Sequence, residues 1–186
     1  LWGFPGFAAA FAILLLIWHS HYIYFRRYAL EDGWASTLNA GLLFLILFLV
    51  YPLKYMATML SRFAHSLALG APEPPFTVSE AQHALVILST GYVGVFLMFA
   101  ALYGHAISKK EQLQLTHQER ALTWFAFWQQ TVHVSVGALV AVVALVGPVQ
   151  VSPFAGFLYG LIGPLILIVR VLIPAPKELA RRHVAE

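Results

Sequence analysis

The stretch STLNAGLLFLILFLVYPLKYMATML, residues 36–60, decides the fold class. Its only charged side chain is Lys54, and a helix of about 20 mostly apolar residues spans the hydrocarbon core of a bilayer. Four more runs of this kind lie at about 6–27, 81–107, 120–147 and 153–174. The sequence therefore predicts an all-α, polytopic membrane helix bundle, a single transmembrane domain over residues 1–186 with five visible transmembrane helices.

The composition agrees with a protein embedded in lipid. Hydrophobic residues make up 60% and charged residues only 10% of the 186 residues, whereas soluble domains carry roughly 25% charged residues. The mean hydropathy is +0.77. The absence of cysteine excludes disulfides and thiolate metal sites, and a formal net charge of +3 carried in short loops is not a nucleic-acid footprint. We therefore expect the lipid bilayer as a partner and no nucleic acid.

The positive charges divide unequally between the connections. If five helices alternate across the membrane, one side carries Arg26, Arg27, Lys109, Lys110, Arg120, Lys177, Arg181 and Arg182. The second connection holds only Lys54 and Arg62. Because cytoplasmic loops carry the excess of Lys and Arg, we predict a multi-pass protein of the plasma membrane with its C-terminus in the cytoplasm. Leu1 would then face outward without a signal peptide, so we expect a sixth helix upstream.

Capping signals mark the starts of the predicted helices. We expect caps from Asp32 for the second helix, Ser79 with Gln82 for the third, Thr116 with Glu119 for the fourth, and Ser152 followed by Pro153 for the fifth. Pro52 should kink or end the second helix. The proline-rich GAPEPPF at 70–76 is expected to be a loop.

The end of the first segment, LLLIWHSHYIYFRRY at residues 14–28, is rich in polar rings. On a helix His19 lies about 200° from His21, so the two imidazoles cannot bind one metal ion. The tyrosines are expected in an interfacial aromatic belt; they are Tyr22, Tyr24 and Tyr28. His21 lies deeper, where an unpaired polar ring is costly in lipid, so it should face protein. Asn39 lies at the same depth in the next helix, and its amide can pair with the imidazole or with a third group.

These two segments resemble a known family. A tryptophan, two spacers, a histidine and a following aromatic residue, then an aspartate, an asparagine and a leucine-rich run ending at proline, are typical of the bacterial and lysosomal potassium channels typified by transmembrane protein 175. The matching residues are Trp18, His21, Phe25, Asp32, Asn39 and Pro52. The similarity is sharpest over about residues 11–56, and beyond them it consists mostly of the helix count.

The resemblance implies a passive potassium-selective cation channel. It implies six helices per repeat, homotetramers in bacteria, and a first, pore-lining helix with a Phe-Ser-Asp motif and bulky apolar side chains at its constriction. It also implies that Trp18, His21 and Asn39 form a polar network that anchors the pore helix. No Phe-Ser-Asp occurs in these 186 residues. The alternative is therefore a non-conducting accessory or structural subunit of a larger membrane complex, and the partners expected are potassium ion and other subunits.

A second polar group lies in WFAFWQQTVHVSVG, residues 124–137. Gln129 and Gln130 precede His133 by four and three positions, so each shares a helix ridge with it. Such a cluster near mid-membrane is either an interhelical hydrogen-bond clip or part of a water or ion pathway.

Two glycine-containing stretches invite comparison with known motifs. STGYVG at 89–94 has the wrong order for the TVGYG filter of other potassium channels, so its small residues predict close helix packing instead. Gly156 and Gly160 form a GxxxG that predicts a second close contact, and the following Gly163–Pro164 predicts a kink.

The remaining function classes find little support. A b-type haem needs two histidines at matching depth, and only His21 and His105 fit that alternative. The sequence has no intramembrane pair of carboxylates, no nucleophile motif and no phosphate-binding loop, so we expect no enzyme activity, no cofactor and no metal site.

Overall fold

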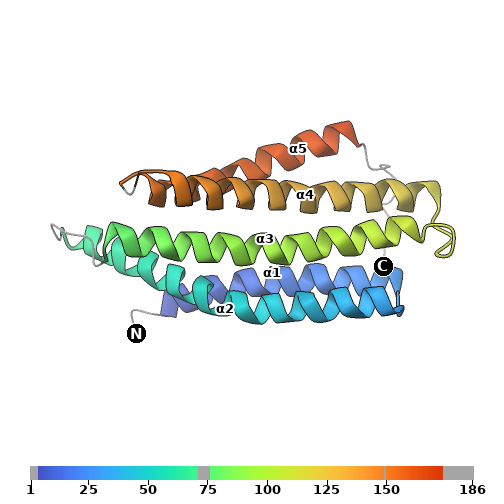
Figure 1. Cartoon of the computed structure of the whole chain (residues 1–186), viewed down its shortest axis with the longest axis horizontal. Helices are drawn as coiled ribbons and strands as arrows, with labels where there is room; N and C mark the ends of the chain where they lie inside the picture. The colour runs from blue at the N-terminus through green and yellow to red at the C-terminus, as the bar shows by residue number, and fades with distance from the viewer. Residues whose placement is uncertain (1–3, 71–75, 149, 174–186) are drawn as a thin grey trace.

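A computed structural model describes residues 4–70, 76–148 and 150–173, and all of the regular structure in them is helical. The elements are α1 (Phe4–Tyr28), α2 (Gly33–Ala68), α3 (Val78–Ser108), α4 (His117–Val146), the 3-10 helix η1 (Ser152–Leu161) and α5 (Ile162–Leu172). Figure 1 shows them running side by side, with α1 and α2 on one side of α3, and α4 followed by α5 on the other. The predicted all-α membrane helix bundle is confirmed.

Four helical segments of the described residues are long and apolar enough to cross a membrane: Gly33–Ala68, Val78–Ser108, His117–Val146 and Phe154–Leu172. α1 has 25 residues, which gives it a length of about 37 Å at the 1.5 Å rise of an α-helix. That length exceeds the roughly 30 Å hydrocarbon core, and its membrane crossing stays a prediction.

α2 is longer than the sequence indicates. It contains Pro52 and continues to Ala68, whereas the apolar run ends near residue 60. Figure 1 shows α2 changing direction along its second half, so the proline bends the helix and does not end it. The connector that follows lies mostly outside the described residues, because 71–75 are not among them.

The core forms on both sides of α3, which is the central helix. One cluster joins α1, α2 and α3, and its fully or nearly fully buried members include Ile17, Tyr24, Leu42, Leu49, Val95, Phe99 and Leu102. A second joins α3, α4 and η1 through Leu85, Val136, Val140, Ala144 and Ala155. Because α3 is buried from two directions, it carries contacts between the two halves of the bundle.

Small residues let α2 and α4 approach α3 closely. A Cβ added at Gly91 would lie 3.0 Å from Leu49 Cδ1, and one added at Gly94 would lie 3.2 Å from Leu45 Cδ1. Ser89 is buried as well, whereas Thr90 is exposed and bonds to Val86 O on its own helix. The predicted packing face is therefore confirmed for Ser89, Gly91 and Gly94 and wrong for Thr90.

The GxxxG prediction is wrong at its second position. A Cβ at Gly160 would meet nothing within 4 Å, and one at Gly156 would meet only Leu85 at 3.8 Å. Both glycines lie in η1, not in a regular α-helix. Pro164 lacks the N–H that would bond to the carbonyl of Gly160 in a continuous helix, and the α-helical part begins only at Ile162.

Two of the four predicted caps are confirmed. The Asp32 carboxylate accepts a hydrogen bond from the backbone N–H of Ala35 at 2.8 Å, and Thr116 forms a capping box with Glu119.

The other two caps are wrong. Thr77 and Glu80 form the capping box of α3, so the helix begins before Ser79, and the side-chain amide of Gln82 donates to Ala144 O on α4 at 2.8 Å. Ser152 does not cap η1; its hydroxyl contacts the carbonyls of Gly147 at 3.0 Å and Pro148 at 2.9 Å. In both cases the predicted polar side chain bonds to the end of α4.

The charge pattern agrees with this arrangement. The end of α1, the start of α2, the end of α3 and the start of α4 meet at one end of the bundle (Figure 1). Arg26, Arg27, Lys109, Lys110 and Arg120 therefore gather at that end, which we call the basic end. The tail lysine and arginines, Lys177, Arg181 and Arg182, lie outside the described residues.

The closest approach between α3 and α4 generates a stability prediction. A Cβ at Gly137 would lie 2.9 Å from both Tyr92 Cδ1 and Val93 Cγ2, and the Tyr92 ring is held by a hydrogen bond to His133. We expect Gly137→Ala to destabilise the protein by about 1–3 kcal/mol through overpacking. Thermal unfolding in detergent measures this.

Gly33→Ala is the matched control, because a Cβ there meets nothing within 4 Å. It should leave the unfolding midpoint unchanged or raise it slightly. Equal midpoints for the two variants would contradict the close approach at Gly137.

Candidate functional site

The first polar contact joins α1 to α2 near the basic end. His21 Nε2 lies 2.7 Å from Asn39 Oδ1, and both side chains are half-buried. Because an amide oxygen only accepts, the imidazole nitrogen donates this bond. The short connection between α1 and α2 makes them an antiparallel pair, which places these residues at the same depth.

Trp18 does not join this contact. Its side chain is 58% exposed and stacks on Tyr22, with ring centroids 5.8 Å apart. The Arg26 guanidinium lies over the Tyr22 ring, 6.0 Å from its centre. The structure thus brings together two of the three residues of the expected network, and Trp18 presents its ring beside them on the outer face of α1.

A second contact joins α2 to α3 at the basic end. His105 Nε2 lies 2.7 Å from Asp32 Oδ2, while the same carboxylate caps α2 through Ala35. The backbone N–H of Ala35 and then the His105 hydrogen bond hold the pKa of Asp32 below its ordinary value. One carboxylate therefore fixes the start of α2 and ties it to the end of α3.

These two contacts bear on the haem alternative. His21 and His105 lie toward the same end of the bundle, as their depths predict. Each ring, however, directs its Nε2 to a protein oxygen, one to Asn39 and the other to Asp32. The pair is therefore not arranged to ligate one iron between them.

Two tyrosines expected in the interfacial belt are instead buried. Tyr24 is 0% and Tyr28 3% exposed, and only Tyr22 is exposed as predicted. The Tyr24 hydroxyl donates to Leu102 O at 2.9 Å. Thr123 donates to Glu119 O at 2.7 Å, so its oxygen accepts from Tyr28 at 2.8 Å.

An aromatic cluster surrounds these hydroxyls. Tyr24 and Tyr28 pack edge-to-face on Tyr103, with ring centroids 5.1 and 6.0 Å apart. The four-residue spacing of Tyr24 and Tyr28 places both on one face of α1. Trp18 and Tyr22 have the same spacing and are exposed, so the spacing alone does not indicate which pair is buried. The cluster locks α1 onto α3 and α4 beside the His21–Asn39 contact.

The polar group in the middle of the bundle forms around His133, but not with the glutamines. His133 Nδ1 lies 2.6 Å from the Tyr92 hydroxyl, and its ring stacks on Phe96 at 4.2 Å. Gln129 is half-buried. Gln130 is 7% exposed, and within the described part of the chain its Oε1 has no hydrogen-bond partner. The helical spacing identified His133 correctly, but it predicted glutamine partners where the structure has Tyr92.

A further tyrosine extends this middle group to η1. The Tyr159 hydroxyl donates to Ser89 Oγ at 2.9 Å, and its ring packs on Tyr92 at 5.0 Å. The group therefore joins α3, α4 and η1 through hydrogen bonds and ring contacts, as an interhelical clip does.

Comparison with known proteins places this arrangement in a family. A search against protein-family models finds no match. A curated relative, "Potassium channel" of Marivirga tractuosa, is 31% identical over 171 residues, covering 87% of this chain and 69% of the relative. A crystal structure of a variant of the potassium channel MtTMEM175, in complex with a nanobody–MBP fusion protein, matches with a TM-score of 0.79 and 28% identity. That match covers 91% of this chain and 77% of the other.

The chain belongs to the family of potassium channels typified by transmembrane protein 175. In this transmembrane-protein-175-type chain, the His21–Asn39 contact occupies the segment where the resemblance is sharpest. The sequence did not indicate the Asp32–His105 contact or the burial of Tyr24 and Tyr28, because the partners of these residues lie on distant helices.

The Asp32 carboxyl generates a pH prediction. Asp32→Asn keeps a capping side chain but removes the charge that faces His105. A pKa held below the ordinary value of 3.8 means that the carboxylate stabilises the folded state above that pH, and that this stability is lost as the pH falls through the folded pKa. We expect Asp32→Asn to lower the unfolding midpoint near neutral pH, by an amount that shrinks as the pH falls through the lowered pKa of Asp32.

The neighbouring exposed carboxylate provides the control. Glu31→Gln removes a charge of the same sign one position away and should give a smaller change. A difference between Asp32→Asn and wild type that stays constant from neutral to acid pH would contradict the role assigned to this carboxyl.

The middle group generates a second prediction. Tyr92→Phe keeps the ring contacts but removes the hydroxyl that bonds His133. We expect a loss of about 0.6 kcal/mol in the free energy of unfolding, the average for hydrogen bonds between membrane helices. A double-mutant cycle with His133→Leu measures it, and Tyr51→Phe, at a position that is 81% exposed, is the control. Zero coupling between positions 92 and 133 would show that the bond contributes nothing.

Proposed function

We propose that this chain is a subunit of a passive, potassium-selective cation channel in the bacterial inner membrane. The observation that carries the proposal is the extent of the match to proteins named potassium channels. The 31% identity extends over 69% of the Marivirga relative, and the fold agrees with a crystallised channel at a TM-score of 0.79. The proposed activity moves an ion down its gradient and requires no chemical conversion.

We propose that the polar residues at the end of α1 anchor a pore-lining helix. His21 and Asn39 use one hydrogen bond between them, and within the described residues neither His21 Nδ1 nor the Asn39 amide nitrogen has a partner. Polar groups below the membrane interface are costly without partners, so these atoms are suited to bind another helix. Trp18 stands beside them, 58% exposed, and offers a ring for that helix to pack on.

We further propose a homotetramer with its C-terminus in the cytoplasm. The tetrameric state is proposed from the family resemblance described above. The topology is supported by the five arginines and lysines gathered at the basic end, since positive side chains mark the cytoplasmic side.

The alternative function is a non-conducting accessory or structural subunit. The 186 residues contain no Phe-Ser-Asp motif, and their match covers 69% of the Marivirga relative. The two functions differ in a single measurable property, which is whether the assembled protein conducts.

A flux assay tests the proposal. The full-length protein, reconstituted into liposomes loaded with potassium, should release potassium faster than sodium under matched gradients. His21→Ala and Asn39→Ala should each lower the flux by about threefold, the equivalent of losing one intramembrane hydrogen bond of ~0.6 kcal/mol. The measurement is the rate of ion release per reconstituted protein.

His19→Ala is the matched control, because His19 is an exposed histidine two residues away and should leave the flux unchanged. Equal effects at positions 19 and 21 would overturn the anchoring role. Absence of any potassium flux from correctly assembled protein would favour the accessory subunit.

A further inference from the structure

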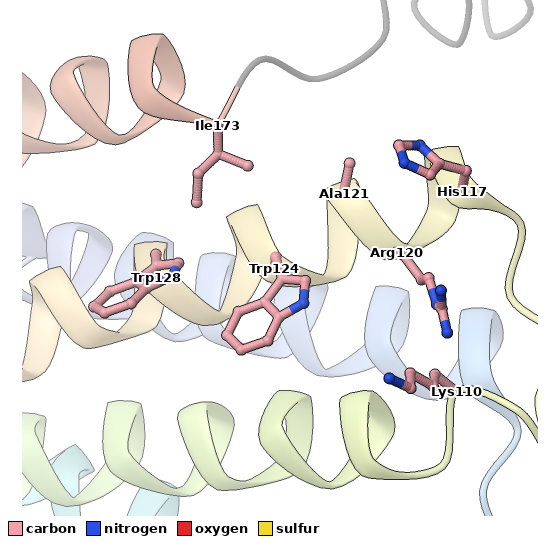
Figure 2. A pocket seen from close by; sticks show the side chains of 7 residues that line it. All are labelled: Lys110, His117, Arg120, Ala121, Trp124, Trp128 and Ile173. Carbon is pink, nitrogen blue, oxygen red and sulfur yellow. The ribbon is translucent and has the colours of Figure 1, made fainter.

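A pocket of about 390 Å³ opens at the basic end of the bundle, beside the first turns of α4. It lies apart from the His21–Asn39 contact. Its walls come from three places in the chain: Lys110 follows α3, His117 to Trp128 lie along the first turns of α4, and Ile173 follows α5. Figure 2 shows these side chains around the opening.

One part of the pocket is strongly basic. Lys110, His117 and Arg120 line it, and no carboxylate is among its lining residues. The nearby Glu119 carboxylate accepts hydrogen bonds from the backbone and hydroxyl of Thr116 in the capping box. The positive side chains are therefore not neutralised by an acidic wall.

Arg120 adds an unsatisfied donor. Its Nε atom is buried, and within the described residues it has no hydrogen-bond partner. A buried N–H of a charged group without an acceptor is costly, and guanidinium groups bind phosphate through paired hydrogen bonds. Because the Nε is closed to a ligand in the pocket, a phosphate there would bond to the terminal nitrogens of the Arg120 guanidinium, and Lys110 and His117 are exposed beside it.

The other part of the pocket is apolar and aromatic. Trp124 and Trp128 are four residues apart on α4, so they lie on one face of it, and they are 44% and 43% exposed. Ile173 lies across from them (Figure 2). Moving along α4 away from the basic end, the wall therefore changes from ammonium and guanidinium groups to indole rings within about three turns.

We propose that this pocket binds an anionic phospholipid. The headgroup phosphate is held by Arg120 and Lys110, with His117 at the rim, and the start of an acyl chain lies against Trp124 and Trp128. Basic pockets between membrane helices on the cytoplasmic side suit anionic headgroups, and tryptophan is favoured at headgroup depth. The indole wall favours a lipid over free phosphate, because a free phosphate has no apolar part to bury there.

Native mass spectrometry of the full-length protein tests the proposal. The probes are phosphatidylglycerol, phosphatidylcholine and inorganic phosphate, each added to detergent-solubilised protein. We expect phosphatidylglycerol to bind more tightly than phosphatidylcholine. We expect the double variant Lys110→Gln with Arg120→Gln to weaken its binding about thirtyfold, since each basic side chain near an anionic headgroup contributes about fivefold.

The opposite end of the bundle supplies the matched control. Lys54 and Arg62 line a second pocket there, so Lys54→Gln with Arg62→Gln makes the same change in net charge at another place. It should leave phosphatidylglycerol binding within about twofold of wild type, because charges far beyond the roughly 10 Å screening length act weakly. Trp124→Leu should weaken the binding of phosphatidylglycerol and leave any binding of inorganic phosphate unchanged.

Several results would overturn the site. They are equal weakening by the two double variants, equal affinity for phosphatidylcholine, or displacement of phosphatidylglycerol by millimolar inorganic phosphate, which would show a free-anion site. The charge-keeping variant Lys110→Arg with Arg120→Lys guards against misfolding: it should retain lipid binding, and its failure to do so while the protein remains folded would also count against the site.

Discussion

The bundle depends on polar side chains that find their partners on neighbouring helices. In an apolar medium a hydroxyl or imidazole without a partner is costly, so each such group can be satisfied in few arrangements of the helices. Tyr28 illustrates the constraint, because its hydroxyl reaches Thr123 on a helix that is distant in sequence. Apolar packing alone would let these helices rotate or slide, and the hydrogen bonds between them select one register.

These contacts form two groups, and α3 belongs to both. Near the basic end, His105 bonds Asp32 at the start of α2, and the carbonyl of Leu102 accepts from Tyr24 on α1. In the middle of the bundle, Tyr92 bonds His133 on α4 and Ser89 accepts from Tyr159 on η1. α3 is therefore the helix through which α1 and α2 are connected by hydrogen bonds to α4 and η1.

Local signals predicted the parts of the fold that depend on neighbours in sequence. Asp32 and Thr116 cap their helices as expected, because a cap bonds to backbone two or three residues away. The Ser152 prediction failed because the hydroxyl found carbonyls at the end of α4, and the Gln82 prediction failed because the amide reached across to the same helix. The candidate site shows the same division: His21 and Asn39 are joined by a short connection, whereas His133 bonds a residue on another helix and not a glutamine on its own ridge.

By itself, the sequence determined that the chain folds as apolar membrane helices, that its positive charges gather at one end, and that His21 and Asn39 share a depth. Composition, helical periodicity and a short connection are sufficient for these conclusions. Only the tertiary structure decided that Tyr24 and Tyr28 are buried, that Tyr92 is the partner of His133, and that Lys110, Arg120 and Trp124 enclose one pocket. The physical reason is that each of these depends on the rotation of one helix against another, which the hydrogen bonds between helices select and which no local pattern encodes.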